Sequence, residues 1–165
     1  MSSHSPETAA LVVPVHDAEV VPLAGAGVFR LLADGTATDG ALGVNRLSLE
    51  TGADGARPHY HARCSEMFYV LDGTASFLLG ERLVTVDAGG LVVVPPGLPH
   101  AFGAAPAATT DLLVVAAPGI DRFGYFRRLG RIAGGEETFA DLLPEQERYD
   151  VHFVDDTLWR SVRAR

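Results

Sequence analysis

The stretch PHYHARCSEMFYVLDG, residues 58–73, is the part of the sequence that decides the fold. It places His59 and His61 two residues apart, a spacing that on a strand sends both imidazoles to the same face. Glu66 follows after a short connection and begins a β-rich run. Two histidines at this spacing are, taken alone, more often surface or core side chains than metal ligands. A metal site therefore requires further ligands.

A second stretch, GGLVVVPPGLPHAF at residues 89–102, supplies the remaining ligand in His100. Pro95 and Pro96 are expected to end a strand, and Gly97 to turn the chain so that His100 enters the same site. Imidazole nitrogen and carboxylate oxygen together suit Fe, Mn, Ni, Co, Cu or Zn, and they can leave positions open for water or substrate. We expect one divalent transition-metal ion, whose identity the donors do not decide. The predicted metal ligands are His59, His61, Glu66 and His100.

Short β-rich runs surround both stretches and are separated by glycine and aspartate turns. The expected strands are Val28–Leu32, Leu42–Leu49, Glu66–Leu71, Ala75–Leu79, Arg82–Val86, Leu91–Val94, His100–Phe102 and Leu112–Ala116. Asp72-Gly73 and Gly80-Glu81 have the composition of hairpin turns. The pattern predicts an all-β antiparallel sandwich or barrel, because the long alternation of strands and helices typical of parallel sheets is missing.

The two ends of the chain differ in character from this central region. Residues 1–26 are expected to form an N-terminal arm with an apolar piece at Leu11–Val15, and residues 27–118 the barrel with the metal site. In residues 119–165, apolar residues recur every third position from Ile120 to Leu129, which predicts a short amphipathic helix. A second helical stretch is expected over residues 136–149, interrupted or restarted at Pro144. We expect both helices to pack on the outside of the barrel; the alternative is a lid over its mouth.

Composition excludes several classes of protein. The chain has 165 residues, 47% of them hydrophobic, which is enough for one core. It carries 13 Lys and Arg against 21 Asp and Glu, so a nucleic-acid partner is not expected. No apolar run approaches the roughly 20 residues needed to cross a bilayer, and the start lacks the pattern of a signal peptide, so we expect a cytoplasmic protein. Cys64 is the only cysteine, which excludes an internal disulfide.

The two motifs closely resemble those of the cupin superfamily. His59, His61, Glu66 and Gly73 match its first motif, and Gly89, Pro95, Gly97 and His100 match its second. The fifteen residues between Gly73 and Gly89 are similar to the short gap of small, single-domain bacterial members. Ala53 and Ala104 depart from the motifs at positions that are not ligands in the family. The resemblance implies a double-stranded β-helix, or jelly-roll barrel, whose lumen holds the ion, with short C-terminal helices.

Alternation along the strands predicts the substrate pocket. If Glu66 points inward then Phe68 and Val70 do so too, and Leu98 and Phe102 share the face of His100. This apolar wall would receive an aromatic or otherwise apolar small molecule, although Phe68 and Phe102 are equally explained as core filling. Cys64, between His61 and Glu66, is left out of the site because the family has no ligand there. His4, His16 and His152 lie outside both motifs.

Fold alone does not fix the activity of such a barrel. The set of three His and one Glu resembles that of quercetinase-like dioxygenases, an oxidoreductase class in which Glu66 would act as the catalytic base on a flavonol- or polyketide-like substrate before O2 reacts. The main alternative is a non-redox isomerase, epimerase or cyclase using the same residues. A non-enzymatic small-molecule binding protein is the third. We also expect a homodimer, formed through the apolar arm and exposed sheet edges.

Overall fold

The structure, a computed structural model, describes residues 9–164. His4 and the first part of the predicted arm therefore lie outside the described residues. The strands are β1 Glu19–Leu23, β2 Gly27–Ala33, β3 Gly43–Leu49, β4 Asp54–Tyr60, β5 Ser65–Leu79, β6 Arg82–Asp87, β7 Leu91–Val94, β8 His100–Ala104, β9 Thr110–Ala117 and β10 His152–Phe153. The helices are α1 Phe123–Ala133, α2 Gln146–Tyr149 and α3 Thr157–Arg163, with 3-10 turns at Val15–Asp17, Gly35–Thr38 and Phe139–Glu145.

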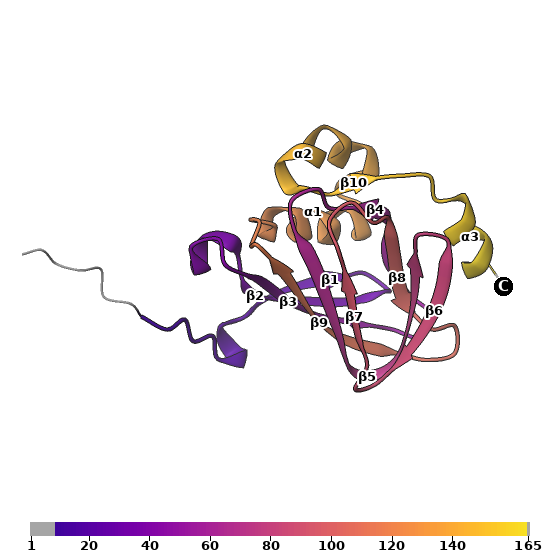
Figure 1. The fold of residues 1–165 in the computed structure, drawn as a ribbon, viewed down its shortest axis with the longest axis horizontal. Coiled ribbons are helices and arrows are strands. Elements are labelled where there is room, and N and C mark those ends of the chain that lie inside the picture. Colours follow the sequence, from indigo (N-terminus) through magenta and orange to yellow (C-terminus); the bar gives the residue numbers. More distant parts are fainter. Residues whose placement is uncertain (1–8, 165) are drawn as a thin grey trace, which may run out of the picture.

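The strands form one strongly curled antiparallel sheet (Figure 1). Their order is β1-β2-β3-β9-β5-β8-β4-β10, and β6 and β7 also pair with β5. The sheet curls because β5 pairs with β7 and β9 along its first half and with β6 and β8 along its second. The predicted all-β class and jelly-roll barrel are confirmed.

Strand β5 corrects the prediction of a hairpin at Asp72-Gly73. The two strands expected there are one continuous strand, which bends between Val70 and Asp72, where its register against β9 shifts. Gly73 has a φ of 73°, and a side chain at this position would overlap the backbone oxygen of Thr109. Glycine thus lets one strand pass from one half of the barrel to the other. The hairpin at Gly80-Glu81 is confirmed, since Leu79 pairs with Arg82.

The list of expected strands lacks β1, β4 and β10. Of these, β1 changes the interpretation of the N-terminal arm. Strand β1, which contains Pro22, pairs along its length with β2 and buries Val21 and Leu23 in the core. Residues 19–23 are therefore part of the sheet. Leu11, Val12 and Val15 before it are exposed. Pro22 sits at an edge, where its missing N–H costs no ladder bond.

The core fills the lumen of the barrel and extends under the helices. Phe68, Phe77 and Phe102 pack with ring centroids 4.7–6.1 Å apart at its centre. All five residues of β8 are buried, because α3 covers the outer face with Trp159 against Leu78 and Ala101. Trp159 thus anchors the C-terminal segment to the barrel.

Helix α1 begins close to the predicted position and lies at the mouth of the barrel (Figure 1). Its residues Phe123, Phe126 and Leu129 pack against the main core. This contact favours the lid alternative over packing on the outside of the sheet. The second helical stretch is shorter than predicted: a 3-10 turn contains Pro144, and α2 begins only at Gln146. None of the described helices is both long and apolar enough to span a membrane.

Candidate metal centre

The four predicted ligands come together inside the barrel. His59 lies on β4 directly opposite His100 on β8, Glu66 is the second residue of β5, and His61 follows the end of β4. All four are buried, with exposed fractions of 1–8%. One ligand atom from each lies within 4.8 Å of those of the others. Residues from three strands thus form a cluster that could hold a metal ion.

The carboxylate of Glu66 bridges two of the imidazoles. Its Oε2 is 3.1 Å from Nε2 of His61, and its Oε1 is 3.3 Å from Nε2 of His100. The rings of His59 and His100 have centroids 4.4 Å apart. The Nε2 atom of His61 is buried and has no hydrogen bond with good geometry among the described residues. A buried imidazole nitrogen that has no hydrogen-bond partner and lies beside a carboxylate is the arrangement expected of two ligands of one metal ion.

Each imidazole is held by its other nitrogen. Nδ1 of His59 lies 2.6 Å from the backbone oxygen of Arg57, Nδ1 of His61 2.6 Å from that of Asp150, and Nδ1 of His100 3.0 Å from that of Leu98. A carbonyl oxygen only accepts, so the tautomer that satisfies these contacts carries its proton on Nδ1, and the lone pair of Nε2 would then be available to an ion. Nδ1 of His61 also lies 3.0 Å from Nη2 of Arg122. Metal-bound histidines are oriented by such hydrogen bonds. The residues present therefore fit the ion that the sequence implies.

Burial and neighbouring charges act in opposite directions on Glu66. Burial alone would raise the pKa of its carboxyl, but His61 and His100 outweigh it and hold the pKa well below its usual range. For His59, burial and the two other histidines lower the pKa well below its usual value. The arrangement thus favours an ionised carboxylate beside a neutral His59, the protonation states that ligation requires.

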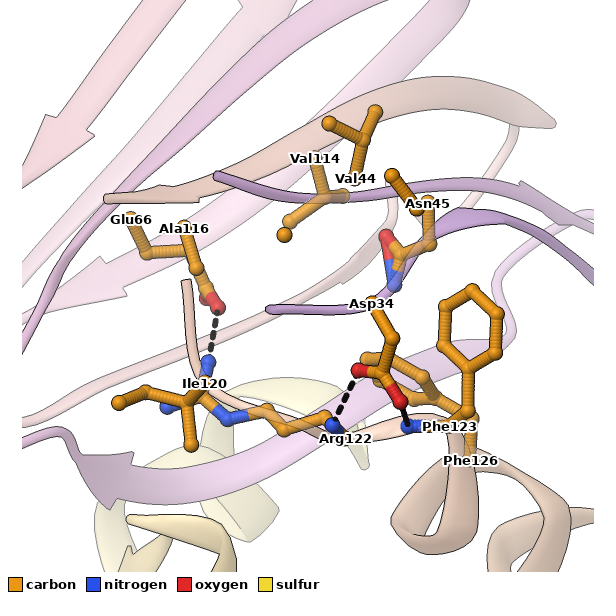
Figure 2. A pocket seen from close by; sticks show the side chains of 12 residues that line it. Asp34, Val44, Asn45, Glu66, Val114, Ala116, Ile120, Arg122, Phe123 and Phe126 are labelled. Carbon is orange, nitrogen blue, oxygen red and sulfur yellow. Dashed lines mark hydrogen bonds and ion pairs between the residues drawn. The ribbon is translucent and has the colours of Figure 1, made fainter. Parts of the chain in front are cut away.

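Arg122 is a functional candidate that sequence reasoning missed. It falls between the apolar positions of the predicted helix, which suggested an exposed charge, but it is only 4% exposed. Its Nη1 lies 3.6 Å from Oε2 of Glu66. Its backbone N–H donates to the carboxylate of Asp34 at 2.7 Å, and so does that of Phe123 at 3.3 Å (Figure 2). A carboxylate that caps the start of α1 therefore fixes the place of Arg122.

Asp150 is the second missed residue, and no motif signals it. Its side chain is fully buried and accepts hydrogen bonds from the backbone N–H groups of Ala62 at 2.8 Å and Arg63 at 2.9 Å. Burial raises the pKa of its carboxyl, but these two bonds and the charges of Arg122 and His61 lower it overall. The C-terminal segment thereby fixes the loop that carries His61.

Cys64 lies beside this network rather than in the ligand set. Its thiol is buried and accepts a hydrogen bond from Nη2 of Arg122 at 3.3 Å. Burial raises its pKa, which opposes the thiolate form. Sγ of Cys64 also lies within 4.8 Å of ligand atoms of His61 and Asp150. The carbonyl and carboxylate of Asp150 are already engaged by hydrogen bonds, which leaves this second group less suited to an ion.

A cavity of about 40 Å³ lies against the cluster beneath α1. Its floor contains His59, His61 and Glu66, its walls include Leu47 and Phe102, and its roof Tyr125, Phe126 and Leu129. This volume exceeds the roughly 10–15 Å³ that a cavity needs to admit one water molecule, so a small polar group can enter. A smaller cavity of about 20 Å³ lies next to it and shares five lining residues, Asn45, Glu66, Val114, Arg122 and Phe126 (Figure 2).

The predicted substrate wall is corrected in part. Phe102 lines the larger cavity, but Phe68, Val70 and Leu98 do not line either of the two. Alternation placed Phe68 and Val70 on the inner face correctly, since both are fully buried. They lie deeper, where Phe68 is packed between Phe77 and Phe102 and has no free surface. The apolar lining that was predicted to come from these residues comes instead from the roof residues of α1.

Comparisons with known proteins agree with this geometry. Residues 45–116 match the family described as Cupin domain, while no curated protein gives a significant match. Among solved structures, the chain resembles an RmlC-like cupin from Shewanella frigidimarina with 20% identity and a TM-score of 0.58, over 71% of this chain and 96% of that one. It resembles Streptomyces PAC13, described as a nucleoside dehydratase, with 20% identity and a TM-score of 0.57, over 70% and 87%.

A further similar structure is the polyketide cyclase RemF from Streptomyces resistomycificus, with 25% identity and a TM-score of 0.54, over 66% of this chain and 80% of that one. The matched family, the curled antiparallel barrel and the His and Glu residues of both motifs point the same way. Residues 45–116 thus match a cupin domain, and the chain has the cupin fold.

Proposed function

We propose that this chain is a metal-dependent enzyme acting on a small enolisable or aromatic molecule. The observation that carries the proposal is the cluster of four ligand atoms, all within 4.8 Å of one another, beside a cavity under α1 that His59, His61 and Glu66 line. A purely structural ion would not need such a cavity, whereas a substrate would. Holding the ion is the role of His59, His61, Glu66 and His100.

A divalent ion bound there would act as a Lewis acid toward a carbonyl, enol or phenol oxygen. The protein supplies the proton transfer: Glu66 Oε2 accepts the proton that the substrate loses. Arg122, whose Nη1 is 3.6 Å from this oxygen, stabilises the negative charge left on the substrate. Phe102 and Phe126 exclude water from the reacting atoms.

Two reactions begin with this proton transfer. The set of three His and one Glu favours dioxygenation, in which O2 adds to the deprotonated, electron-rich carbon of a flavonol- or polyketide-like substrate. The similarity to RemF, a polyketide cyclase, favours a non-redox isomerisation or cyclisation, in which the proton returns to another atom of the same molecule. The described similarities support the non-redox reaction as much as the dioxygenase.

The test uses protein reconstituted with each of Fe, Mn, Ni, Co, Cu and Zn and compared with a Glu66→Gln variant. O2 uptake with quercetin, lost in Glu66→Gln, would establish the dioxygenase. Turnover of polyketide-like compounds under anaerobic conditions would establish the non-redox enzyme. Binding of such compounds without turnover under either condition would favour the non-enzymatic binding protein. If no metal binds, the whole proposal is wrong.

The homodimer remains a proposal, supported by exposed apolar residues. Leu11, Val12 and Val15 are 52–77% exposed in the described part of the N-terminal arm, and Leu91 and Val93 are exposed on β7. Apolar surface of this kind is commonly covered by a partner. Light scattering at micromolar concentration should give the mass of a dimer, and a monomer would exclude this proposal.

A further inference from the structure

Asn45 places an unpartnered polar atom at the wall of the cavities. The residue lies on β3 and is only 5% exposed. Its Oδ1 is buried without a hydrogen-bond partner among the described residues. Figure 2 shows its amide directed from β3 toward the space above the start of α1. A buried carbonyl oxygen without a partner costs roughly 1–3 kcal/mol, so a bound hydrogen-bond donor at this place would be favourable.

Arg122, which lines the same two cavities, has N–H groups that make no hydrogen bond to the described residues. Its Nε donates to the backbone oxygen of Tyr149 at 2.8 Å. Its Nη2 lies within hydrogen-bond distance of three groups: Nδ1 of His61 at 3.0 Å, the backbone oxygen of Asp150 at 3.1 Å and Sγ of Cys64 at 3.3 Å. These contacts use the single N–H of Nε and both of Nη2. The described partner nearest to Nη1 is Glu66 Oε2 at 3.6 Å, which is beyond hydrogen-bond distance. The N–H groups of Nη1 are therefore available to a ligand.

Both side chains line the same two adjoining cavities, so one small ligand can contact both. The larger cavity joins them to the metal cluster through Glu66, and the smaller one extends toward Asp34. The remaining wall is largely apolar, with Val114 and Phe126 shared by the two cavities. An apolar pocket with a few convergent polar groups is the usual form of a small-molecule site.

We propose that Asn45 and Arg122 form a polar anchor that selects substrates carrying a hydroxyl or enol group next to an anionic or carbonyl oxygen. The hydroxyl donates to Oδ1 of Asn45, and Nη1 of Arg122 donates to the neighbouring oxygen. This inference rests on the proposed function, because it names the substrate class of that same site. It adds to the metal ligands two residues that decide which molecule is accepted.

The size of the cavities limits the part of the substrate that fits beneath α1. The two cavities measure about 20 Å³ and about 40 Å³, so a small head group suits the space beneath α1. A hydroxy acid or hydroxyketone head group has about this size. The inference therefore favours substrates whose reacting end is small.

The test compares glycolate with two analogues that each lack one feature, acetate without the hydroxyl and glycolamide without the charge. Titrations followed by ¹H–¹⁵N spectra of the full chain report on the Asn45 side-chain amide, whose signal is identified by its loss in Asn45→Leu. We expect glycolate to shift this signal and to bind at least about tenfold more tightly than acetate, the discrimination expected when a site hydrogen-bonds a hydroxyl. Acetate should leave the signal unchanged.

Two variants test separately whether Asn45 accepts from the hydroxyl and whether Arg122 donates to the neighbouring oxygen. In Asn45→Leu, glycolate and acetate should bind equally, because the acceptor for the hydroxyl is gone. In Arg122→Lys, which keeps a positive charge, the preference for glycolate over glycolamide should be reduced by about tenfold, because the fixed donor geometry is lost. Ser76→Ala, a buried polar residue outside both cavities, is the matched control and should bind all three compounds like the wild type.

Metal-loaded and chelator-treated protein distinguish this inference from the proposed function. A hydroxyl preference that depends on Asn45 in both states supports the anchor even if no metal-dependent turnover is found. Metal binding with an unchanged glycolate-to-acetate ratio in Asn45→Leu overturns the anchor but leaves the metal site intact. Absence of any glycolate shift at the Asn45 amide would show that the space holds internal water only, which also overturns it.

Discussion

Nδ1 of His61 donates to the backbone oxygen of Asp150 across 2.6 Å, although the two residues are 89 positions apart in the chain. The same oxygen accepts from Nη2 of Arg122 at 3.1 Å. Two buried donors thus meet on one carbonyl that belongs to the segment after the barrel. The orientation of a predicted metal ligand therefore depends on residues outside both sequence motifs.

Replacing Asp150 with Ala should loosen the loop that carries His61. The variant loses the acceptor for the N–H groups of Ala62 and Arg63, so we expect the free energy of unfolding to fall by about 2–4 kcal/mol. Urea denaturation measures this change. Asp155→Ala, which removes an exposed carboxylate bonded only to Thr157, should cost less than about 1 kcal/mol. Equal losses in the two variants would contradict this role of Asp150.

Replacing His61 or His100 with Ala should remove the metal, because either change deletes one of four clustered donors. Elemental analysis of purified, reconstituted protein is the measurement. His16→Ala is the matched control: His16 is exposed and lies outside the cluster, so its loss should leave the metal content unchanged. Full metal occupancy in both ligand variants would refute the proposed metal centre.

Metal content should also fall with pH. Imidazole must be neutral to bind, and its ordinary pKa is about 6.5, so lowering the pH below roughly 6 makes protons compete with the ion. Dialysis over a pH series followed by metal analysis should show loss on the acidic side only. Unchanged metal content in strong acid would contradict histidine ligation.

The Arg46–Asp111 ion pair predicts a pH dependence of stability away from the metal site. Burial raises the pKa of the Asp111 carboxyl, but the hydrogen bonds from Arg46 lower it overall below 3.8. Between the lowered pKa of the folded chain and the ordinary value of 3.8, the unfolded chain binds more protons than the folded one. The free energy of unfolding therefore rises with pH in this window, and the full contribution of the ion pair is present above it. Asp111→Asn should cost roughly 1 kcal/mol at pH 7. Chemical denaturation should show this difference closing as the pH falls below about 4, and a constant difference would contradict it.

Replacing Phe126 with Ala should enlarge the cavity under α1. The ring lines both cavities and packs 4.8 Å from that of Phe29, so its loss should cost roughly 2–3 kcal/mol of stability, less than for a fully buried phenylalanine. We expect the variant to bind larger aromatic compounds more tightly than the wild type, as measured by calorimetry. Leu143→Ala, at an exposed position, is the control. Weaker binding of all aromatic compounds in Phe126→Ala would argue against α1 as the roof.

The sequence predicted the barrel and the metal cluster because both depend on local patterns. Alternation marked the inner face of β5, and the two motifs marked the four residues that meet in the lumen. Arg122 and Asp150 were not predicted as functional residues, because their burial depends on how the C-terminal segment returns across the barrel. No periodicity in the sequence encodes that path. Asn45 escaped because a single polar residue on the inner face of a strand gives no signal until the neighbouring groups are known. The same holds for β10, whose two residues pair with β4.

Helix α1 forms the roof of the cavity, whereas the floor comes from β4, the residue that follows it and β5. The two parts belong to separate segments of the chain, and the roof residues Tyr125, Phe126 and Leu129 are not part of the ligand cluster. The range of accepted molecules can therefore be altered by substitutions within one eleven-residue helix while the metal chemistry stays the same. For protein engineering, α1 is the segment to randomise, and success would be a new substrate range at an unchanged metal content.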